Sequence, residues 1–443
     1  MEVTLMQMLE AREQRAARQV ALSRKYGKAL ISFSMNIPGP VKTSPLIRRG
    51  FQEGLRALEQ RLPEERVLAK EVKEAVTGCE AILVVDMEAL SLKAITTRIE
   101  DEHGLGRLFD MDVIGPDLSK LDREAVGGGS RNCIVCGAPG RGCASRRVHS
   151  VAELQTATKS ILRQYFAKAD AERIGALAVR SLLDEVETTP KPGLVDTRNS
   201  GSHRDMDIHT FRLSAAALGD YYRDCVRIGM DTAEEPPAET FRQLRAAGLQ
   251  AEQVMFAATK GINTHKGAIF TLGILCGAAG RLWDPAGKWE EAAIFPEISA
   301  MTGGAMEADW KKGGNTVGYR LFAQNGIRGI RGEAADGLPS VEKIGMPVYR
   351  DCLERGMDSN EAGVRTLLNL MARVEDTNMI ARGGLEGAQA GREAVCRLLE
   401  GEYTLKDVEE LDDWFIQRRL SPGGCADLLA CVYFLFGLIN ETE

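Results

Sequence analysis

Two aspartates separated by one residue, Asp110 and Asp112, are the first residues in this chain whose spacing suits catalysis. They lie in the run 108–114, LFDMDVI, where apolar and polar residues alternate as in a strand. Residues i and i+2 of a strand point to the same face, so both carboxylates can bind one hard cation. Mg²⁺ takes one or two protein carboxylates together with phosphate oxygens. We expect a magnesium site for phosphoryl or nucleotidyl transfer here; the alternative is a solvated strand edge.

Basic residues follow a rigid Pro-Gly-Pro loop at 38–40 and are candidate phosphate ligands. Lys42, Arg48 and Arg49 are close enough in sequence to bind one polyphosphate, as ammonium and guanidinium groups do. The alternative for each of them is an ordinary solvated charge.

Cys133, Cys136, Cys143 and His149 have the most metal-like spacing in the chain. Three thiolates and one imidazole complete a tetrahedral Zn²⁺ site, which would stabilise a short Gly-rich segment with little core of its own. The alternative is a set of reduced thiols in a loop, because the gap between Cys136 and Cys143 is longer than in the usual paired Cys-x2-Cys arrangement.

A long polar loop at 187–207 joins two expected helices of the second half and is rich in ionisable groups. Loops of this kind are more often functional than structural. Asp205 and Asp207 are a second candidate Mg²⁺ pair, and His203 has an ordinary pKa suited to proton transfer near neutrality. Helix capping by an aspartate explains one or two of these residues but not the whole cluster.

Four further helix junctions share this polar, Gly-rich character: 261–270, 326–333, 376–384 and 420–427. In the first, backbone N–H groups and Lys266 can bind phosphates at a helix start. In the second, Arg328 and Arg331 lie on a flexible loop that suits a triphosphate. The last is equally explained as an N-cap followed by proline. Together the loops indicate a site for Mg²⁺ and ATP without a P-loop.

The elements that position these residues divide the chain into two parts. Up to about residue 125, strand-like runs alternate with helical segments. The expected strands are Ala29–Met35, Ala81–Val85, Ala89–Ile99 and Leu108–Ile114. From about residue 150 long helical periods dominate and strands nearly vanish. We expect a multidomain protein with a mixed α/β domain at 1–160 and a larger all-α domain at 161–443.

Composition sets the broad class. The chain has 443 residues, a net charge of −7 and a hydrophobic fraction of 44%, which indicates two or three folded domains rather than disorder. The acidic balance argues against a nucleic-acid binder. No apolar run reaches the length of a membrane span and the first residues lack a signal-peptide core, so we expect a cytoplasmic protein without a membrane partner. Ten cysteines are too dilute for a disulfide scaffold.

Several strings resemble the blocks of two enzyme families. From about residue 165 onward, the chain resembles triphosphoribosyl-dephospho-CoA synthases through PKPGLVDTRNSGSHRDMD, GINTHKGAIF, RGIRGEAADGLPSV, DTNMIARGG and LSPGGCADLLA, in that order. Up to about residue 155, it resembles apo-citrate lyase phosphoribosyl-dephospho-CoA transferases through AREQRAARQ, LISFSMNIPGPVK, GLGRLFDMDVIGP and the CIVCG segment. The chain thus resembles a fusion of two consecutive enzymes, the first with a nucleotidyltransferase-like domain.

The resemblance implies two reactions and a protein partner. The C-terminal domain would join the ribose 2′-hydroxyl of 3′-dephospho-CoA to the anomeric carbon of the ATP ribose, with loss of adenine. The N-terminal domain would transfer the phosphoribosyl-dephospho-CoA unit to a serine of the acyl carrier (gamma) subunit of citrate lyase, with release of pyrophosphate. Loss of adenine requires an acid, a base and stabilisation of an oxocarbenium-like ribose. Serine attack on phosphorus requires Mg²⁺ on paired carboxylates.

The resemblance also implies roles for the candidate residues. The expected Mg²⁺ ligands are Asp110, Asp112, Asp205 and Asp207. The expected catalytic residues are Asp110, Asp112, Glu187, His203 and His265. The expected nucleotide-binding residues are Lys42, Arg48, Lys191, Asn199, Asn263, Lys266, Arg328, Arg331, Glu333, Asp376, Asn378 and Arg382.

Two other interpretations stay open at this point. The same chemistry could serve the carrier of malonate decarboxylase, although the citrate-lyase-like blocks favour citrate lyase. A zinc-stabilised module without catalytic activity, fused to a helical ATP-binding domain, explains the Cys/His segment. It does not explain the Asp-Met-Asp strand or the ordered junction loops.

Overall fold

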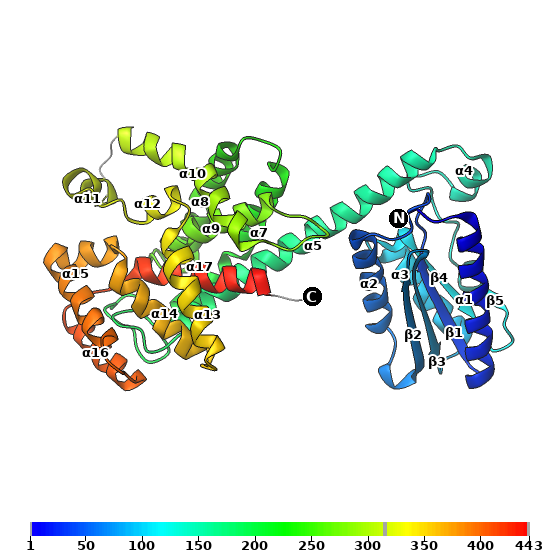
Figure 1. Ribbon diagram of the computed structural model, residues 1–443, viewed down its shortest axis with the longest axis horizontal. Helices are drawn as coiled ribbons and strands as arrows, with labels where there is room; N and C mark the ends of the chain where they lie inside the picture. Colours follow the sequence, from blue (N-terminus) through cyan, green and yellow to red (C-terminus); the bar gives the residue numbers. More distant parts are fainter. Residues whose placement is uncertain (1, 313–316, 441–443) are drawn as a thin grey trace. The chain divides into compact units, whose positions relative to one another are not determined.

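The computed structural model describes residues 2–312 and 317–440, which form two compact units (Figure 1). The N-terminal unit comprises Met1–Ala167 together with Pro285–Gly287. The C-terminal unit comprises Lys168–Asp284 and Lys288–Glu443. Helix α5, Val151–Glu187, contributes residues to both units.

The N-terminal unit is built on a five-stranded antiparallel sheet with strand order β2-β3-β1-β4-β5. Its strands are β1 (Ala29–Met35), β2 (Val67–Ala75), β3 (Gly78–Val85), β4 (Phe109–Ile114) and β5 (Lys120–Leu121). Its helices are α1 (Leu5–Tyr26), α2 (Pro45–Glu59), α3 (Ala89–Glu102) and α4 (Gly140–Arg146), with 3₁₀ turns η1 (Glu64–Arg66), η2 (Gly106–Leu108) and η3 (Arg123–Val126). The expected mixture of helices around a small sheet is confirmed.

Helices pack against both faces of this sheet. On one face Phe33 of β1 stacks on Phe51 of α2, with ring centroids 4.8 Å apart. On the other face Leu22 of α1 packs with Leu30 and Ile82 of the sheet. Burial of one such side chain contributes about 1.5–3 kcal/mol to folding. The apolar contacts fix α1 across the sheet and leave the remaining, polar part of that face for a site.

The strand predicted at 89–99 is wrong, because this segment belongs to helix α3. Leu92, Thr96 and Ile99 are buried, and their spacing of four and three residues is that of one helix face. The strand that the prediction missed is β2, whose alternating Lys and Glu residues are typical of an edge strand. Its weak hydrophobic pattern explains the omission.

The C-terminal unit is mostly helical, as the sequence predicts. After α5 its helices are α6 (Ile208–Ala217), α7 (Gly219–Asp231), α8 (Pro237–Ala258), α9 (Lys266–Arg281), α10 (Glu291–Lys312), α11 (Val317–Asn325), α12 (Gly329–Ala335), the π-helical η4 (Val341–Gly345), α13 (Met346–Glu354), α14 (Ser359–Arg373), α15 (Thr377–Leu399), α16 (Leu405–Gln417) and α17 (Gly423–Asn440). The side chains of α9 and α17 supply much of its core.

Helix α17 combines high hydropathy with burial (Figure 1, red). Among the described residues it is the one helix long and apolar enough to cross a membrane by length and composition, with a mean hydropathy of 1.6. In the folded unit 56% of this stretch is buried, and Leu429, Phe434 and Leu435 have no exposed surface. The apolar composition of α17 is therefore explained by its place in the core.

Candidate active sites

Three carboxylates lie on the α1-facing side of the N-terminal sheet. Asp110 and Asp112 share this face of β4, because the residues on either side of them are buried on the opposite face. In the sheet register Asp110 lies opposite Ser34 of β1, which lies opposite Glu80 of β3. Glu80 is thus a third acidic group of the site. The sequence analysis missed it because tertiary strand pairing determines which residues become neighbours.

The three carboxylates differ in their partners. Glu80 pairs with Arg15 of α1 at 3.3 Å, and Asp112 accepts a hydrogen bond from Nζ of Lys120 at 2.7 Å. Asp110 has no hydrogen bond to another described residue, and desolvation together with the Asp112 carboxylate raises its pKa. Because a bound cation would offset both effects, Asp110 and Asp112 fit the Mg²⁺ that the sequence predicts.

A cavity of about 150 Å³ opens beside Asp110. Arg12 and Arg15 of α1 and Lys42 also line it. Nζ of Lys42 donates to a backbone carbonyl at 2.6 Å, and burial together with Arg12 lowers the Lys42 pKa. Arg12 and Arg15 were absent from the predicted site, although their three-residue spacing on one helix face could have indicated them. Arg48 lies on α2 and does not line this cavity.

The C-terminal unit contains a cavity of about 1200 Å³. Most of the residues predicted for this half line it: Lys191, His203, Asp205, Asn263, His265, Lys266, Arg328, Arg331, Glu333, Asp376, Asn378 and Arg382. These residues come from segments far apart in the sequence, and the fold brings them to one cavity. Its volume exceeds the roughly 300–1,000 Å³ of most small-ligand sites, so it has room for large or paired ligands.

Three residues predicted for this half lie outside the lining of the cavity. Glu187 is exposed and ion-paired on the surface. Asp207 caps helix α6 through its Oδ1 atom. Asn199 belongs to the loop that follows α5. Asp205 therefore reaches the cavity without Asp207, and the second expected Mg²⁺ pair is not assembled there.

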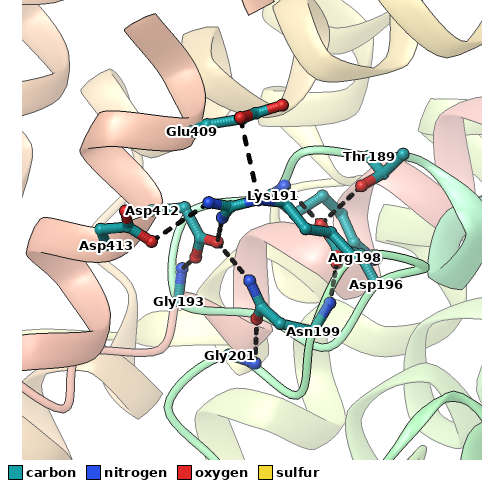
Figure 2. Close-up of polar contacts among 10 residues, drawn as sticks. All are labelled: Thr189, Lys191, Gly193, Asp196, Arg198, Asn199, Gly201, Glu409, Asp412 and Asp413. Carbon is teal, nitrogen blue, oxygen red and sulfur yellow. Dashed lines mark hydrogen bonds and ion pairs between the residues drawn. The ribbon is translucent and has the colours of Figure 1, made fainter. Parts of the chain in front are cut away.

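Two buried carboxylates fix the loop between α5 and α6 (Figure 2). Asp196 accepts hydrogen bonds from the backbone N–H groups of Lys191 and Asn199, each at 2.9 Å. Asp412 of α16 accepts from the N–H of Gly193 at 2.8 Å and from the Asn199 side chain at 2.7 Å. Asn199 thus stabilises the loop, and the loop in turn positions Lys191.

Lys191 is a buried cation beside the cavity, with 1% of its surface exposed. Its Nζ donates to Oε1 of Glu185 at 2.5 Å and to the Glu185 carbonyl oxygen at 2.6 Å. Burial raises the Glu185 pKa and the Lys191 charge opposes this. Removal of one partner from such a buried pair strongly destabilises the fold. Lys191 is therefore held in place in the cavity wall.

His265, just before α9, lines the cavity and has one buried ring nitrogen without a partner among the described residues. Its Nδ1 lies 2.7 Å from the hydroxyl of Ser214, which accepts the Thr264 hydroxyl at 2.7 Å. A Ser214 hydroxyl that donates its own hydrogen to Nδ1 would place the ring proton on Nε2. Nε2 is buried without a partner among the described residues. Burial and nearby Lys191 lower the His265 pKa to about 3, so the ring is neutral at pH 7.

His203 is also neutral but has both nitrogens occupied. Nδ1 accepts from Arg382 at 3.0 Å, so Nε2 donates to the Ser421 hydroxyl at 3.0 Å. Burial and the Arg382 charge lower its pKa to about 4. The geometry suits a residue that orients Arg382 and Ser421 rather than one that supplies a proton.

Acidic side chains from separate segments line the same cavity: Glu185, Glu333, Asp376 and Asp427. Burial together with the charges of Glu185 and Asp376 raises the pKa of Asp427 well above its usual range. Gly267 leaves room for this carboxyl, since an added Cβ would lie 1.8 Å from its Oδ2 atom. Asp427 was not a predicted catalytic residue, because the junction 420–427 was equally explained as an N-cap followed by proline. It is the carboxyl best suited to hold a proton.

The expected triphosphate ligands Lys266, Arg328 and Arg331 all line the cavity. Lys266 pairs with Glu252 at 2.7 Å and Arg328 with Asp336 at 2.5 Å. Arg331 makes no ion pair within the described part of the chain. When a triphosphate binds, Lys266 and Arg328 would exchange their partly exposed carboxylate partners for phosphate oxygens, which form contacts of the same kind.

A sheet unit with clustered carboxylates and a helical unit with a large cavity lined by charged side chains give this protein two candidate sites. Two family models match in the same order. The model described as apo-citrate lyase phosphoribosyl-dephospho-CoA transferase (CitX) matches residues 3–165. The model described as ATP:dephospho-CoA triphosphoribosyl transferase (CitG) matches residues 171–443.

Similar proteins support this division. "Protein CitXG" of Haemophilus influenzae is 34% identical over 456 residues, covering 98% of this chain and 96% of the relative. "Protein CitXG" of Leuconostoc mesenteroides subsp. cremoris is 34% identical over 462 residues, covering 99% and 98%. A 2-(5''-triphosphoribosyl)-3'-dephosphocoenzyme-A synthase of Klebsiella pneumoniae is 40% identical over 273 residues, covering 60% and 90%. The chain belongs to the family of CitX–CitG fusion proteins and is a bifunctional transferase.

Proposed function

We propose that the chain makes the citrate lyase prosthetic group in its C-terminal domain, 161–443, and attaches it with its N-terminal domain, 1–160. The observation that carries this assignment is that the two family matches fall on successive units, each with its own cavity lined by charged side chains. ATP and 3′-dephospho-CoA are the substrates of the first reaction. The proposed location is the cytoplasm. A purely structural module is not supported, because both matching families are transferases.

In the helical cavity the 2′-oxygen of dephospho-CoA forms a bond to the anomeric carbon of the ATP ribose, and the bond to adenine breaks. Asp427 gives a proton to the departing adenine, since burial raises its pKa and so favours the protonated form. Glu333 takes the hydroxyl proton; it accepts hydrogen bonds from the Ser340 N–H at 3.0 Å and hydroxyl at 2.6 Å, which hold it in place.

The cations and the unpaired histidine of this cavity bind the substrates. Arg331, Lys266 and Arg328 bind the triphosphate, and Asn263, Asn378 and Arg382 contact the nucleotides. The Nε2–H of His265 donates to a ligand acceptor, because a buried donor without a partner is otherwise costly by about 1–3 kcal/mol. Asp205 is the carboxylate proposed to bind Mg²⁺ together with the triphosphate.

In the sheet unit a serine hydroxyl of the carrier attacks phosphorus of the intermediate and pyrophosphate leaves. Asp110 and Asp112 would hold Mg²⁺, which supplies charge neutralisation on the phosphate oxygens. Arg12, Arg15 and Lys42 bind the leaving phosphates, as they line the cavity beside Asp110. We assign this unit a nucleotidyltransferase-like role on the grounds of this carboxylate pair. The proposed partner is the gamma subunit of citrate lyase.

The test is to incubate the purified chain with Mg²⁺, ATP and 3′-dephospho-CoA and to follow adenine and product mass by chromatography and mass spectrometry. Adenine with a triphosphoribosyl-dephospho-CoA mass is the expected result. Apo carriers of citrate lyase and of malonate decarboxylase are then added in parallel, and we expect faster modification of the first. Formation of ADP or AMP, or no turnover, would refute the C-terminal assignment.

A further inference from the structure

We propose that Cys133, Cys136, Cys143 and His149 form a structural Zn²⁺ site that stabilises the segment beside the first residues of β4. One ligand atom from each of these four residues lies within 4.8 Å of every other. Among the described residues this is the one group of three or more Cys, His, Asp or Glu side chains that meets this condition. We call it the Cys/His cluster.

The spacing of the ligand atoms fits one tetrahedral ion. Sγ of Cys136 lies 3.5 Å from Sγ of Cys143 and 3.2 Å from Nε2 of His149. Zn–S bonds of about 2.3 Å and Zn–N bonds of about 2.0 Å give S···S and S···N separations of roughly 3.8 and 3.5 Å in a tetrahedron. The observed separations need to change by only a few tenths of an ångström. The separation between the sulfur atoms of Cys136 and Cys143 is also far longer than a disulfide bond, which is about 2.05 Å.

The backbone around the cluster is already folded into a ligand-presenting turn. The N–H of Cys133 donates to the carbonyl of Ala138 at 2.7 Å, and the N–H of Gly137 donates to the carbonyl of Cys133 at 3.0 Å. Sγ of Cys133 accepts the N–H of Val135 at 3.5 Å. Gly137 has φ +72°, a conformation that favours glycine.

Packing does not account for this order. None of the side chains described between residues 127 and 150 is buried. The adjacent helix α4 has only seven residues, which is too short to be stable alone. A segment with little apolar burial usually needs a disulfide or a metal to hold one structure. The three cysteines and one histidine of the Cys/His cluster are suited to bind such a metal.

The cluster is tied to the strand that carries Asp110. Arg131, two residues before Cys133, donates to the carbonyl oxygens of Phe109 at 2.8 Å and Gly106 at 2.5 Å. Arg107 in turn donates to the carbonyl of Asn132. These contacts link the segment of the cluster to the backbone directly before Asp110. The effect on catalysis rests on the proposed function, whereas the metal site does not.

The experiment measures zinc in the full-length chain, purified without chelators, by inductively coupled plasma mass spectrometry. We expect about one zinc per chain in the wild type and a loss of at least tenfold in Cys136→Ser and Cys143→Ser. Cys396→Ser, which removes a partly exposed thiol of α15 in the other unit, is the matched control and should keep the metal. Wild-type protein stripped with a chelator should give the absorption of tetrahedral cobalt thiolate when Co²⁺ is added.

Activity separates the two parts of the inference. Transfer from preformed intermediate to the apo carrier should fall at least tenfold in stripped protein and recover with Zn²⁺, while adenine release is unchanged. A wild-type chain that holds no zinc and gives no tetrahedral cobalt spectrum overturns the site, as does full metal retention by Cys143→Ser. A disulfide between Cys136 and Cys143 in the intact mass also overturns it. Zinc loss without loss of transfer overturns the link to β4.

Discussion

In the N-terminal unit the candidate carboxylates lie on paired strands of one sheet, whereas in the C-terminal unit they come from separate helices and loops. Asp110 and Asp112 share a face because they are two residues apart in β4. Asp376 and Asp427 are brought together only when α15 and α17 pack in the same unit. The two sites thus depend on local geometry and on tertiary packing, respectively.

The charge around the carboxylates differs in the same way. In the sheet, Arg15 and Lys120 pair with the acidic groups next to Asp110. The site therefore already contains negative charges for a metal and positive charges for phosphates. In the helical cavity, burial and mutual repulsion raise the pKa of Asp427. The first environment suits metal-dependent attack on phosphorus, and the second suits proton transfer to a leaving base. The predictions below test this difference.

Asp110→Asn should have the largest effect. Loss of a Mg²⁺-binding carboxylate removes several kcal/mol of transition-state stabilisation, so transfer to the carrier should slow about 10³-fold. The rate is measured with preformed intermediate and apo carrier. Asp117→Asn, which alters an exposed aspartate after β4, is the control and should keep most activity. A near-normal rate for Asp110→Asn would remove the metal from the sheet site.

Asp427→Asn should slow adenine release by about 10²–10³-fold, because asparagine has the same shape but cannot give a proton. Initial rates are measured with ATP and 3′-dephospho-CoA. Asp351→Asn, on the exposed surface of α13, is the matched control. If Asp427→Asn releases adenine at the wild-type rate, the acid must be another group.

Asp412→Ala should destabilise the C-terminal unit by about 3–5 kcal/mol, because Arg198 and the N–H of Gly193 lose a buried partner. Calorimetry should show a lower Tm for that unit and an unchanged transition for the sheet unit. Asp413→Ala removes an exposed carboxylate that pairs with the same Arg198 at 3.3 Å, and should cost less than about 1 kcal/mol. Equal losses of stability in the two variants would contradict the role of Asp412 as the buried partner of Arg198 and Gly193.

His265 should make the stability of the C-terminal unit depend on pH. Its pKa of about 3 lies below the unfolded value, so between these values the unfolded chain binds the extra proton. Its contribution is therefore present above about pH 6.5 and is lost as pH falls, by up to about 1.4 kcal/mol per pH unit. From pH 7 to pH 5 the wild-type Tm should fall more than that of His265→Gln. Parallel curves would show that the ring titrates normally.

Glu187→Gln should have the smallest effect on adenine release, less than about twofold, because an exposed ion pair contributes about 0–1 kcal/mol. The sequence pointed to Glu187 for proton transfer, and the fold directs it away from the cavity. The same adenine assay measures it. A loss comparable to that of Asp427→Asn would return proton transfer to this residue.

Local patterns explain which parts could be predicted. The alternation of β4 and the helical periods of the second half are properties of short windows, so the Asp110–Asp112 pair and the mostly helical unit were accessible from sequence. Glu80 joins the pair only through strand register, which no short window contains. The strand predicted at 89–99 fails because its buried residues follow a helical spacing.

Protonation could not be predicted at all. His203 and His265 were candidates for proton transfer because an unperturbed histidine titrates near neutrality. Burial, together with Arg382 and Lys191, lowers their pKa values to about 4 and 3, and neither neighbour is close in sequence. For Asp427 burial acts in the opposite direction, because it raises the pKa of this carboxyl, and no short window of sequence shows that burial.

The most direct test of two separate sites compares Asp110→Asn and Asp427→Asn in both reactions, side by side, with folding checked by Tm. We predict that Asp110→Asn releases adenine at the wild-type rate but modifies the carrier about 10³-fold more slowly. We predict that Asp427→Asn modifies the carrier normally from preformed intermediate but releases little adenine. Loss of both reactions in either correctly folded variant would contradict a division of the chemistry between the sheet unit and the helical unit.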